Sequence, residues 1–568
     1  MDVITREELK SASFSQLQND CEALRKEIFD TVSVRGGHLA SNLGVVELTV
    51  ALHRVFCFPE DKIVFDVGHQ CYAHKLLSDR AERFSTLRSR GGISGFPKRS
   101  ESPYDSYETG HAGTAISAAL GIAKARDLKG EDFCVIALVG DGSFNNGLIY
   151  EALNSLKILK TRILIVLNDN GMSISPTVGG THEVLSELKE GNGPLADVAL
   201  FERYGLHYMG VYNGNDLSEL LPAMEQAKSL LSTQSVLLHV TTRKGQGYVF
   251  CEQRPDRTHG VSPNRPGKEY SAALGEELTA LAEKDPRIVA VTAAMTDSLG
   301  LRPFFNAFPE RAFDVGICEE HACVLSAALA TEGMHPYYAI YSTFLQRAYD
   351  EVIHDVCGQN LPATFCIDRA GITGADGETH QGVFDLSYLA PVPNLTIAIP
   401  SNISEFRAML RLSASYPAPL AIRYPREGEE GEFLPVEIGK FAVLRSNTTD
   451  IIIYAAGERC IKLAASVLSA AEAQGTGFTL VNARFLKPID RDFILSRKEK
   501  YVITIEDNVC IGGLGDAVAR VLRGRDKVIQ SLGIDDTFLP HGTVQELAEE
   551  CGLNKKNLLS CLLDCHAR

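Results

Sequence analysis

Short apolar runs alternate along most of this chain with segments that have helical periodicity. The runs at 133–139 and 163–167 consist almost entirely of β-branched and other apolar residues. Unbroken runs of this length are typical of strands covered on both faces, as in a parallel sheet between helices. The segment 45–56 instead repeats its apolar positions every three or four residues, which predicts an amphipathic helix. The pattern therefore predicts an α/β fold.

Two stretches interrupt this alternation. Residues 253–267 are rich in Arg, Pro and Gly, and residues 427–435 are acidic and contain glycine. Both compositions are typical of connections between domains. The chain has 568 residues, which is long enough for several domains. We expect three α/β domains, each with a mainly parallel sheet flanked by helices, at residues 1–265, 266–430 and 431–568.

Charge and cysteine content narrow the class of function. The net charge of −16 argues against nucleic acid as a partner, because binding to phosphate backbones requires a basic face. The 14 cysteines are scattered and none forms a Cys-x-x-Cys pair, which favours reduced thiols over a disulfide framework or a zinc site. The polar N-terminus and the absence of a long apolar run predict neither a signal peptide nor a membrane span. We therefore expect a cytoplasmic protein that binds small molecules.

Polar side chains follow both of the apolar runs described first. Gly140-Asp141-Gly142 comes directly after one run, and Asn170 and Met172 lie just beyond the other. Because ligands bind at the carboxyl ends of parallel strands, Asp141 and Asn170 are placed to hold an ion, and their oxygen atoms suit Mg²⁺. They stand 29 positions apart, the spacing of a thiamine-diphosphate signature in which the backbone carbonyl two residues on, here that of Met172, is a further ligand.

The alternative for this motif is a tight Asp-Gly turn beside an ordinary polar loop. A single Gly-Asp-Gly sequence would favour that alternative. Two elements with the correct spacing, each at the end of a predicted strand, favour the Mg²⁺ and thiamine diphosphate site. Gly140 and Gly142 also allow the backbone to approach a diphosphate closely.

Three histidines, His38, His69 and His111, lie in glycine-containing loops ahead of predicted helices. A single histidine in such a loop is more often structural than functional. Three of them indicate a function, because helix N-termini and free backbone amides bind phosphate groups.

The chain resembles the 1-deoxy-D-xylulose-5-phosphate synthases, thiamine-diphosphate enzymes that are related to transketolase. The resemblance covers nearly the whole chain. Its most specific stretches are GHQCYAHK at 68–75, YSTFLQRAYDEVIHDV at 341–356 and DRAGITGADGETHQGVFDL at 368–386. The resemblance implies a homodimer, with Mg²⁺ and diphosphate bound by the first domain and the aminopyrimidine ring bound by the second.

The resemblance also implies a set of cofactor residues. The Mg²⁺ ligands would be Asp141, Asn170 and Met172. The residues lining thiamine diphosphate would be His69, Gly110, His111, Ala112, Gly142, Ser143, Asn170, Tyr248, Glu319 and Phe344. Among these, Glu319 would hydrogen-bond the pyrimidine ring and Phe344 would stack on it. A solvated acidic pair with Glu320 is the alternative for Glu319.

The implied reaction joins pyruvate, after loss of CO₂, to glyceraldehyde 3-phosphate. Besides Glu319, the catalytic residues would be His38, His259 and His380, since imidazoles transfer protons near neutral pH. The residues that bind substrate would be Tyr341, Arg347, Arg369, Asp376, His380 and Arg423. Arginine suits a phosphate because its planar guanidinium binds in a bidentate manner. A surface ion pair is the alternative for each arginine, and it is favoured for Arg426.

The chain departs from the family pattern near the diphosphate end of the cofactor. Residues 111–113 are His-Ala-Gly where His-Ser-Ser is usual, residues 143–146 are bulkier than usual, Gly171 replaces a glutamate and Glu320 replaces a glutamine. The connection after Asn170 and the linker near the end of the first domain are also short. Two alternatives to the family reaction stay open: a diverged ketol-transferase with another donor or acceptor, and a non-catalytic paralogue with a binding role.

Overall fold

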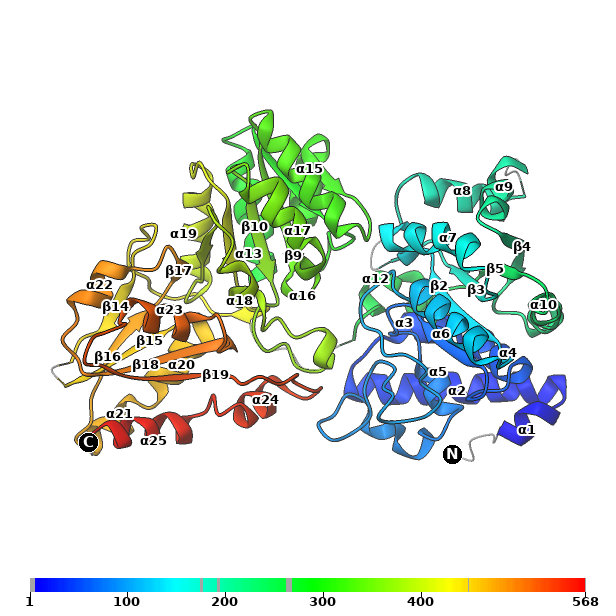
Figure 1. The fold of residues 1–568 in the computed structure, drawn as a ribbon, viewed down its shortest axis with the longest axis horizontal. Helices are drawn as coiled ribbons and strands as arrows, with labels where there is room; N and C mark the ends of the chain where they lie inside the picture. The colour runs from blue at the N-terminus through cyan, green and yellow to red at the C-terminus, as the bar shows by residue number, and fades with distance from the viewer. Residues whose placement is uncertain (1–5, 174–176, 192–194, 262–267, 448, 567–568) are drawn as a thin grey trace. The chain divides into compact units, whose positions relative to one another are not determined.

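The computed structural model describes residues 6–173, 177–191, 195–261, 268–447 and 449–566. The chain divides into two compact units, Met1–Arg265 with Gly316–Cys318, and Pro266–Val315 with Glu319–Arg568 (Figure 1). Mainly parallel sheets flanked by helices make up both units, which confirms the predicted fold class. The second unit contains two large sheets, so the domain boundary predicted near residue 430 lies within it and stays a prediction.

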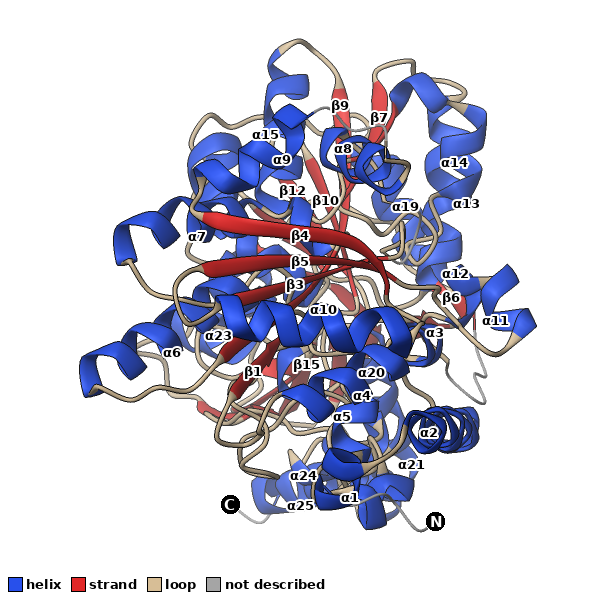
Figure 2. Ribbon diagram, turned by 90° about the vertical axis from the view of Figure 1, so that its right-hand side faces the viewer, coloured by secondary structure: helices blue, strands red, loops and turns tan. Residues whose placement is uncertain are grey.

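The first unit is built on a parallel five-stranded sheet. Its strand order is β1-β2-β3-β5-β4, and Figure 2 shows β4, β5 and β3 beside helix α10. The strands are β1 (Lys62–Phe65), β2 (Val135–Gly140), β3 (Leu164–Asp169), β4 (Leu206–Asn213) and β5 (Ser235–Thr241). The helices are α1 (Arg6–Ser11), α2 (Phe14–Arg35), α3 (Leu39–Gly44), α4 (Val46–Val55), α5 (Tyr72–Leu76), η1 (Ala81–Thr86), α6 (Ala115–Lys129), η2 (Ser143–Asn145), α7 (Gly147–Leu159), α8 (Gly180–Lys189), α9 (Leu195–Arg203), α10 (Leu217–Leu230), α11 (Val249–Gln253) and α12 (Pro255–Thr258).

The two apolar runs of the sequence form β2 and β3, and both faces of these strands are buried. Along β2, Ile136 and Leu138 pack into one core cluster, whereas Ala137 and Val139 pack into another on the opposite face. Alternate residues therefore serve two layers of helices, which explains why these strands are apolar throughout.

The stretch predicted as a linker, 253–267, is helical in part. It includes the end of α11 and all of α12, and residues 262–267 lie outside the part that the structure describes. Every helix among the described residues is too short or too polar to cross a bilayer.

The second unit contains a seven-stranded and a five-stranded sheet. Their strand orders are β17-β11-β12-β10-β9-β7-β8 and β14-β16-β15-β18-β19, and β13 and β6 form a two-stranded ribbon. The strands are β6 (Lys268–Glu269), β7 (Ile288–Thr292), β8 (Ala312–Asp314), β9 (His335–Tyr341), β10 (Thr364–Asp368), β11 (Thr396–Ala398), β12 (Leu420–Arg423), β13 (Glu427–Gly428), β14 (Ala442–Arg445), β15 (Ile451–Ala455), β16 (Thr479–Asn482), β17 (Phe485–Lys487), β18 (Tyr501–Val509) and β19 (Val528–Ile534).

Helices cover the sheets of the second unit as well. They are α13 (Tyr270–Ala282), α14 (Arg302–Ala307), η3 (Pro309–Arg311), α15 (Glu319–Thr331), α16 (Ser342–Leu345), η4 (Gln346–Ala348), α17 (Tyr349–Glu351), η5 (Val352–Cys357), η6 (Gly377–Thr379), α18 (Asp385–Leu389), α19 (Ile403–Ser413), α20 (Glu458–Ser466), α21 (Leu468–Ala473), α22 (Arg491–Ser496), α23 (Leu514–Val521), α24 (Val544–Glu550) and α25 (Lys555–His566). Strand β17 lies between β16 and β18 in the sequence but pairs antiparallel with β11, so the chain returns from the five-stranded sheet to the edge of the seven-stranded sheet.

Candidate active site

The loops after β2 and β3 lie side by side. The two strands are parallel neighbours in which Gly140 pairs with Asn168, and the backbone amide of Asp141 donates to the Asn168 carbonyl (3.1 Å). The amide of Asn170 then donates to Asp141 Oδ1 (3.2 Å), and the amide of Met172 donates to Asn170 Oδ1 (3.0 Å). The three residues predicted to bind Mg²⁺ are therefore joined in one hydrogen-bonded loop pair.

The carboxyl group of Asp141 has polar partners but, among the residues that the structure describes, no ion-pair partner. It is 1% exposed and accepts a hydrogen bond from the Thr177 hydroxyl (2.7 Å). Burial, and the nearby charge of Asp169, raise the pKa of Asp141 to about 6. A bound divalent cation would stabilise the ionised form, so the loop fits Mg²⁺.

Such a cation would need oxygen ligands other than carboxylates. Among the described residues, no three His, Cys, Asp or Glu side chains gather into a group that could hold a metal ion. The carboxylate of Asp141, the amide oxygen of Asn170 and the carbonyl of Met172 are hard oxygen donors, and Mg²⁺ completes such a partial set with water and phosphate oxygens.

A second carboxylate, that of Asp169 at the end of β3, stabilises the loop that carries Asn170 and Met172. Its oxygens accept from the Gly171 amide (3.1 Å), from Lys189 Nζ of α8 (3.0 Å) and from His239 Nε2 of β5 (3.1 Å), and His239 Nδ1 is 2.9 Å from the Tyr208 hydroxyl. Burial raises the pKa of Asp169, but the hydrogen bonds from His239 and Lys189 outweigh it and the pKa is lowered. Sequence reasoning did not assign a role to these residues.

Lys244 is a further residue that sequence reasoning missed. Its ammonium group is buried beside the same loop and donates to the Ser173 carbonyl. Burial lowers the pKa of Lys244 to about 8, and the charge of Asp141 acts against that shift. The signal in the sequence was a lysine followed by two glycines at 245 and 247, just after β5.

The close approach of two loops explains why residue 142 of the Gly-Asp-Gly motif is glycine. A Cβ on Gly142 would lie 2.9 Å from the Cβ of Ser173. The Gly-Asp-Gly turn and the loop after β3 therefore pack too closely for a side chain at this position. Ser143, the next residue, is buried at the start of η2.

The structure brings together three of the predicted histidines. The ring centroids of His38, His69 and His259 lie 5.2, 5.3 and 5.4 Å apart in pairs. Asn42 orders two of these loops by donating to the carbonyls of His38 (2.6 Å) and His69 (2.7 Å). Ser41 Oγ is 3.3 Å from His259 Nδ1.

Burial, the charge of Lys244 and the other two rings hold the pKa of His259 well below its usual range. The ring of His259 is therefore neutral at pH 7 and has one nitrogen that can accept a proton.

The other cofactor candidates of the first unit are less tightly grouped. Asp66 accepts from the amides of Gly113 (2.9 Å) and Ala115 (3.0 Å), which fixes the loop that carries Gly110, His111 and Ala112 at the start of α6. Tyr248 stacks on Phe29 of α2, with ring centroids 4.2 Å apart. Its ring therefore packs on α2.

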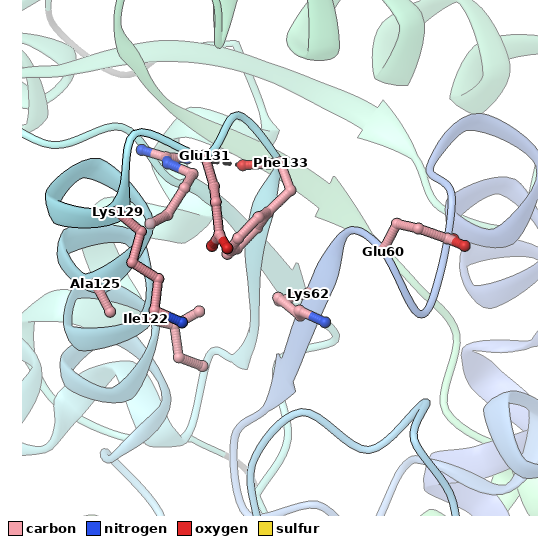
Figure 3. A pocket seen from close by; sticks show the side chains of 8 residues that line it. Glu60, Lys62, Ile122, Ala125, Lys129, Glu131 and Phe133 are labelled. Atoms are coloured by element: carbon pink, nitrogen blue, oxygen red, sulfur yellow. Dashed lines mark hydrogen bonds between the residues drawn. The ribbon is translucent and has the colours of Figure 1, made fainter.

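A surface pocket of about 450 Å³ lies elsewhere on this unit. Figure 3 shows Lys62 and Phe133 among the side chains that line it. Lys62 begins β1 and Phe133 precedes β2, so the pocket lies at the amino ends of these strands, whereas Asp141 follows the carboxyl end of β2. None of the predicted site residues lines it.

In the second unit, Glu319 is the first residue of α15 and is 4% exposed. Arg347 is its ion-pair partner, and Arg347 Nη1 donates to Glu319 Oε2 (3.2 Å). Glu319 is thus not part of a solvated acidic pair. The ring of Phe344 stacks on Tyr341 (5.6 Å) and meets the edge of His380 (5.7 Å).

Arg369 lies over the ring of Tyr341 and forms an ion pair with Asp368. Its guanidinium lies 4.2 Å from the Tyr341 ring centroid and donates to Asp368 (2.7 Å). Its φ of 55° is in the left-handed region, which is unfavourable for a residue with a Cβ. Asp376 and His380 lie on the loop that follows.

Arg423 is less available for substrate than the sequence suggested. It is 3% exposed, and its guanidinium pairs with Asp385 (3.1 Å) and Asp507 (2.7 Å). Arg426, for which we favoured a surface ion pair, has a side chain that is 34% exposed and lies 3.5 Å from Glu269. A phosphate would have to displace two buried carboxylates from Arg423, whereas Arg426 pairs with one carboxylate among the described residues.

Comparisons with known proteins support one family along the chain. Residues 1–194 and 192–242 match the family model described as 1-deoxy-D-xylulose-5-phosphate synthase. Residues 267–428 match the transketolase pyrimidine binding domain, and residues 439–558 match the transketolase C-terminal domain. The two segments of the first match meet at 192–194, within the connection that we expect to be short.

Relatives and a solved structure match over almost their whole lengths. The 1-deoxy-D-xylulose-5-phosphate synthase of Clostridium tetani is 43% identical and the alignment covers 97% of each chain. The synthase of Syntrophotalea carbinolica is 44% identical, over 97% of this chain and 95% of that protein. The crystal structure of transketolase from Campylobacter jejuni is 19% identical and covers 97% of this chain and 100% of its own, with a TM-score of 0.47.

The resemblance found in the sequence is thereby confirmed. At this identity and coverage, the chain belongs to the 1-deoxy-D-xylulose-5-phosphate synthase family, whose members are transferases that depend on thiamine diphosphate and Mg²⁺.

Proposed function

We propose that this chain condenses pyruvate with D-glyceraldehyde 3-phosphate to give 1-deoxy-D-xylulose 5-phosphate and CO₂, using the residues described above. The observation that carries the proposal is Asp141: a buried carboxyl group at the end of β2, with a raised pKa and with no ion-pair partner in the described part of the chain. Such a group is costly to bury alone, and a bound cation would offset that cost. Asp141, Asn170 and the Met172 carbonyl would hold Mg²⁺.

Thiamine diphosphate, when bound, supplies the nucleophilic carbon that cleaves pyruvate and carries the two-carbon fragment. Lys244 would pair with the diphosphate, since its buried ammonium lies beside the Mg²⁺ loop. His69, Gly110, His111, Ala112, Gly142 and Ser143 would line the same end of the cofactor. Tyr248, which stacks on Phe29 of α2, would line the cofactor as well.

Glu319 would hydrogen-bond the aminopyrimidine ring. Its carboxylate is nearly buried, and Arg347 holds it in a fixed orientation. Phe344 would stack against the same ring. This arrangement makes Arg347 a partner of the glutamate as well as a candidate ligand of substrate.

The histidines would move protons. His259 is neutral at pH 7, so it can take a proton from a substrate hydroxyl, and His38 lies against it. His380 would exchange a proton with the aldehyde substrate. Its Nδ1 is 2.8 Å from the Thr379 hydroxyl. Neutral imidazoles are suited to this role because each presents one donor and one acceptor.

The acceptor site would be formed by Tyr341, Arg369 and Asp376. Arg369 is held over Tyr341, so its guanidinium is oriented before a phosphate arrives. Arg423 was predicted to join this set, but its pairing with two carboxylates favours the more exposed Arg426 as the second phosphate ligand.

We further propose a homodimer in the cytoplasm. The homodimer follows from the family resemblance. The location is supported by the thiol content, because Cys366 of β10 and Cys460 of α20 are both buried and neither forms a disulfide. Size-exclusion chromatography with light scattering tests the dimer.

The decisive experiment for the reaction is product analysis. The purified protein is incubated with thiamine diphosphate, Mg²⁺, pyruvate and glyceraldehyde 3-phosphate, and the products are identified by mass spectrometry. We expect 1-deoxy-D-xylulose 5-phosphate and one CO₂ per turnover, and none with the Asp141→Asn variant. A different ketose, or no ketose with the cofactor bound, would contradict the proposal and favour a ketol-transferase with another substrate pair.

A further inference from the structure

Asp376 and His380 belong to a loop with a closed base. The amide of Gly371 donates to the Gly382 carbonyl (2.6 Å) and the amide of Gly382 donates back to Gly371 (2.9 Å). We call residues 371–382 the acceptor loop. Because its two ends are hydrogen-bonded to each other, the orientation of the whole loop depends on what holds this base.

Two arginines bind the two ends of the base. Arg423 Nη2 donates to the carbonyl of Gly382 (3.3 Å), and Arg459 Nη2 donates to the carbonyl of Ile372 (3.2 Å). Arg423 ends β12 of the seven-stranded sheet, whereas Arg459 lies on α20, which packs on the five-stranded sheet. The acceptor loop is therefore held by side chains from both parts of the second unit.

Asp507 of β18 connects the two arginines. One of its oxygens accepts from Arg423 Nη1 (2.7 Å) and the other from Arg459 Nη1 (2.9 Å). The carboxylate also lies against the loop itself, since a Cβ on Gly371 would be 2.0 Å from Asp507 Oδ2. Only glycine fits there, and its φ of 79° is one that glycine adopts without strain.

Other contacts attach the loop to the same part of the chain. The Val509 amide donates to the Val383 carbonyl (2.9 Å), directly after the loop. Within the loop, Gln381 Oε1 accepts from the Thr373 amide (2.8 Å) and its Nε2 lies 3.3 Å from the Pro540 carbonyl. The contacts are buried or partly buried, so water does not compete freely for them.

We propose that Asp507, through Arg423 and Arg459, is a positioning residue for the acceptor loop, and that the C-terminal part of the chain in this way sets the affinity for the aldehyde acceptor. Of the residues predicted to bind cofactor or substrate, Asp507 is hydrogen-bonded to Arg423, which we assign here to positioning the loop and not to binding the phosphate. The inference rests on the proposed function, in which Asp376 and His380 contact the acceptor. It assigns a role to a region that otherwise carries no site residue.

The test is the Asp507→Asn variant of the full chain. An amide has one acceptor oxygen in place of two, so one guanidinium loses its partner and faces an NH₂ group. Arg423 keeps Asp385, which favours retention of the fold. We expect the KM for glyceraldehyde 3-phosphate to rise by up to about 100-fold, the cost of misplacing a positioned group by about 1 Å. The KM for pyruvate and the dissociation constant of thiamine diphosphate should change by less than about twofold.

Amide hydrogen exchange provides a readout that does not depend on activity. In the variant, we expect faster exchange at residues 372–382 and unchanged exchange in β2 and β3. The matched control is Glu472→Gln, which breaks the surface ion pair between Arg445 and Glu472 and should alter none of these quantities.

Each result has a defined meaning. Unchanged exchange in the loop together with an unchanged acceptor KM would overturn the positioning role of Asp507. Faster exchange with an unchanged acceptor KM would support the positioning role of Asp507 in the loop. It would contradict the proposed acceptor role of Asp376 and His380, and with it the effect of Asp507 on acceptor affinity. An equal rise in the KM for glyceraldehyde 3-phosphate, the KM for pyruvate and the dissociation constant of thiamine diphosphate would mean a general loss of structure. That result would also overturn the inference.

If the asparagine variant does not fold, Arg459→Gln takes its place. This side chain is 30% exposed and its removal leaves the buried pairs of Arg423 in place. The same selective rise in the acceptor KM is expected, to a smaller extent, and its absence would contradict the proposal.

Discussion

Arg347 donates to the carboxylate of Glu319 across 3.2 Å, and both side chains are almost buried. The pair lies at the start of α15, where the helix N-terminus also favours a negative charge. The guanidinium of Arg347 and the N-terminus of α15 therefore both stabilise the carboxylate of Glu319 in this position. The arrangement orients Glu319 before any ligand binds, which is what a hydrogen-bond acceptor for a ring nitrogen requires.

Removing the charge of Glu319 should abolish turnover without unfolding the protein. We expect kcat of Glu319→Gln to fall by about 10²- to 10⁴-fold, the usual contribution of a positioned proton-transfer group. The isosteric amide still accepts from Arg347, so the melting temperature should stay close to that of the parent. Steady-state kinetics and circular dichroism measure the two effects. The neighbouring Glu320→Gln variant serves as the control, and equal losses in both variants would refute the role of Glu319.

Affinity for thiamine diphosphate should depend on the charge of Lys244. The pKa of this lysine is lowered to about 8, so the ammonium is charged below pH 8 and neutral above it. Because only the charged form attracts a diphosphate, binding should weaken as pH rises through about 8. Titration calorimetry between pH 7 and pH 9 at saturating Mg²⁺ measures this.

In the Lys244→Met variant, the dissociation constant should be about 10- to 100-fold higher at pH 7, which is the loss expected for one charge-assisted hydrogen bond. Its pH dependence above pH 7 should also be flat. A slope that survives in the variant would assign the titration to another group.

The sequence predicted the parts of the site that arise from local pattern. The apolar runs identified β2 and β3, and their parallel pairing followed from α/β alternation, so Asp141 and Asn170 were expected to meet. The position of His259 beside His38 could not be derived in this way, because the two residues are separated by the entire sheet in sequence. Only the family resemblance linked them.

Electrostatic partners were the least predictable feature. Arg423 was recognised as an arginine near the acceptor motifs, but Asp507, which neutralises it, comes from a different sheet. Lys244 precedes two glycines in the sequence, and its burial depends on how the loop after β5 folds against residues 140–173. Tertiary contacts of this kind have no local signature in the chain.

Lys189 should support Mg²⁺ binding from a distance. Its ammonium pairs with Asp169, which holds the Gly171 amide within the loop of Asn170 and Met172. In Lys189→Met, Asp169 keeps its hydrogen bond with His239 but loses its ammonium partner, so the loop is less well ordered. We expect a dissociation constant for Mg²⁺ that is about 3- to 10-fold higher, with kcat at saturating Mg²⁺ nearly unchanged. Lys160→Met, on an exposed helix end, is the control, and an unchanged Mg²⁺ titration would exclude this role of α8.

Glu506 should make the stability of the C-terminal sheet depend on pH. It is fully buried in β18 and accepts from the amides of Leu514 (2.8 Å) and Gly515 (2.9 Å) at the start of α23. Burial raises its pKa to about 8 from the usual 4.5, although the two amide hydrogen bonds oppose the shift. Between these two pH values the folded state therefore keeps a proton that the unfolded chain releases.

Since the folded state binds more protons in this window, its stability falls as pH rises from about 4.5 to about 8 and levels off above that. A neutral glutamine at this position has no charge to bury, so the Glu506→Gln variant should lose this part of the slope. The free energy of unfolding in urea is measured at pH 5, 7 and 9, with hydrogen exchange in β18 as the probe. The measurement compares the variant with the parent and with the surface control Glu472→Gln. The same slope in all three proteins would show that Glu506 ionises normally in the folded state.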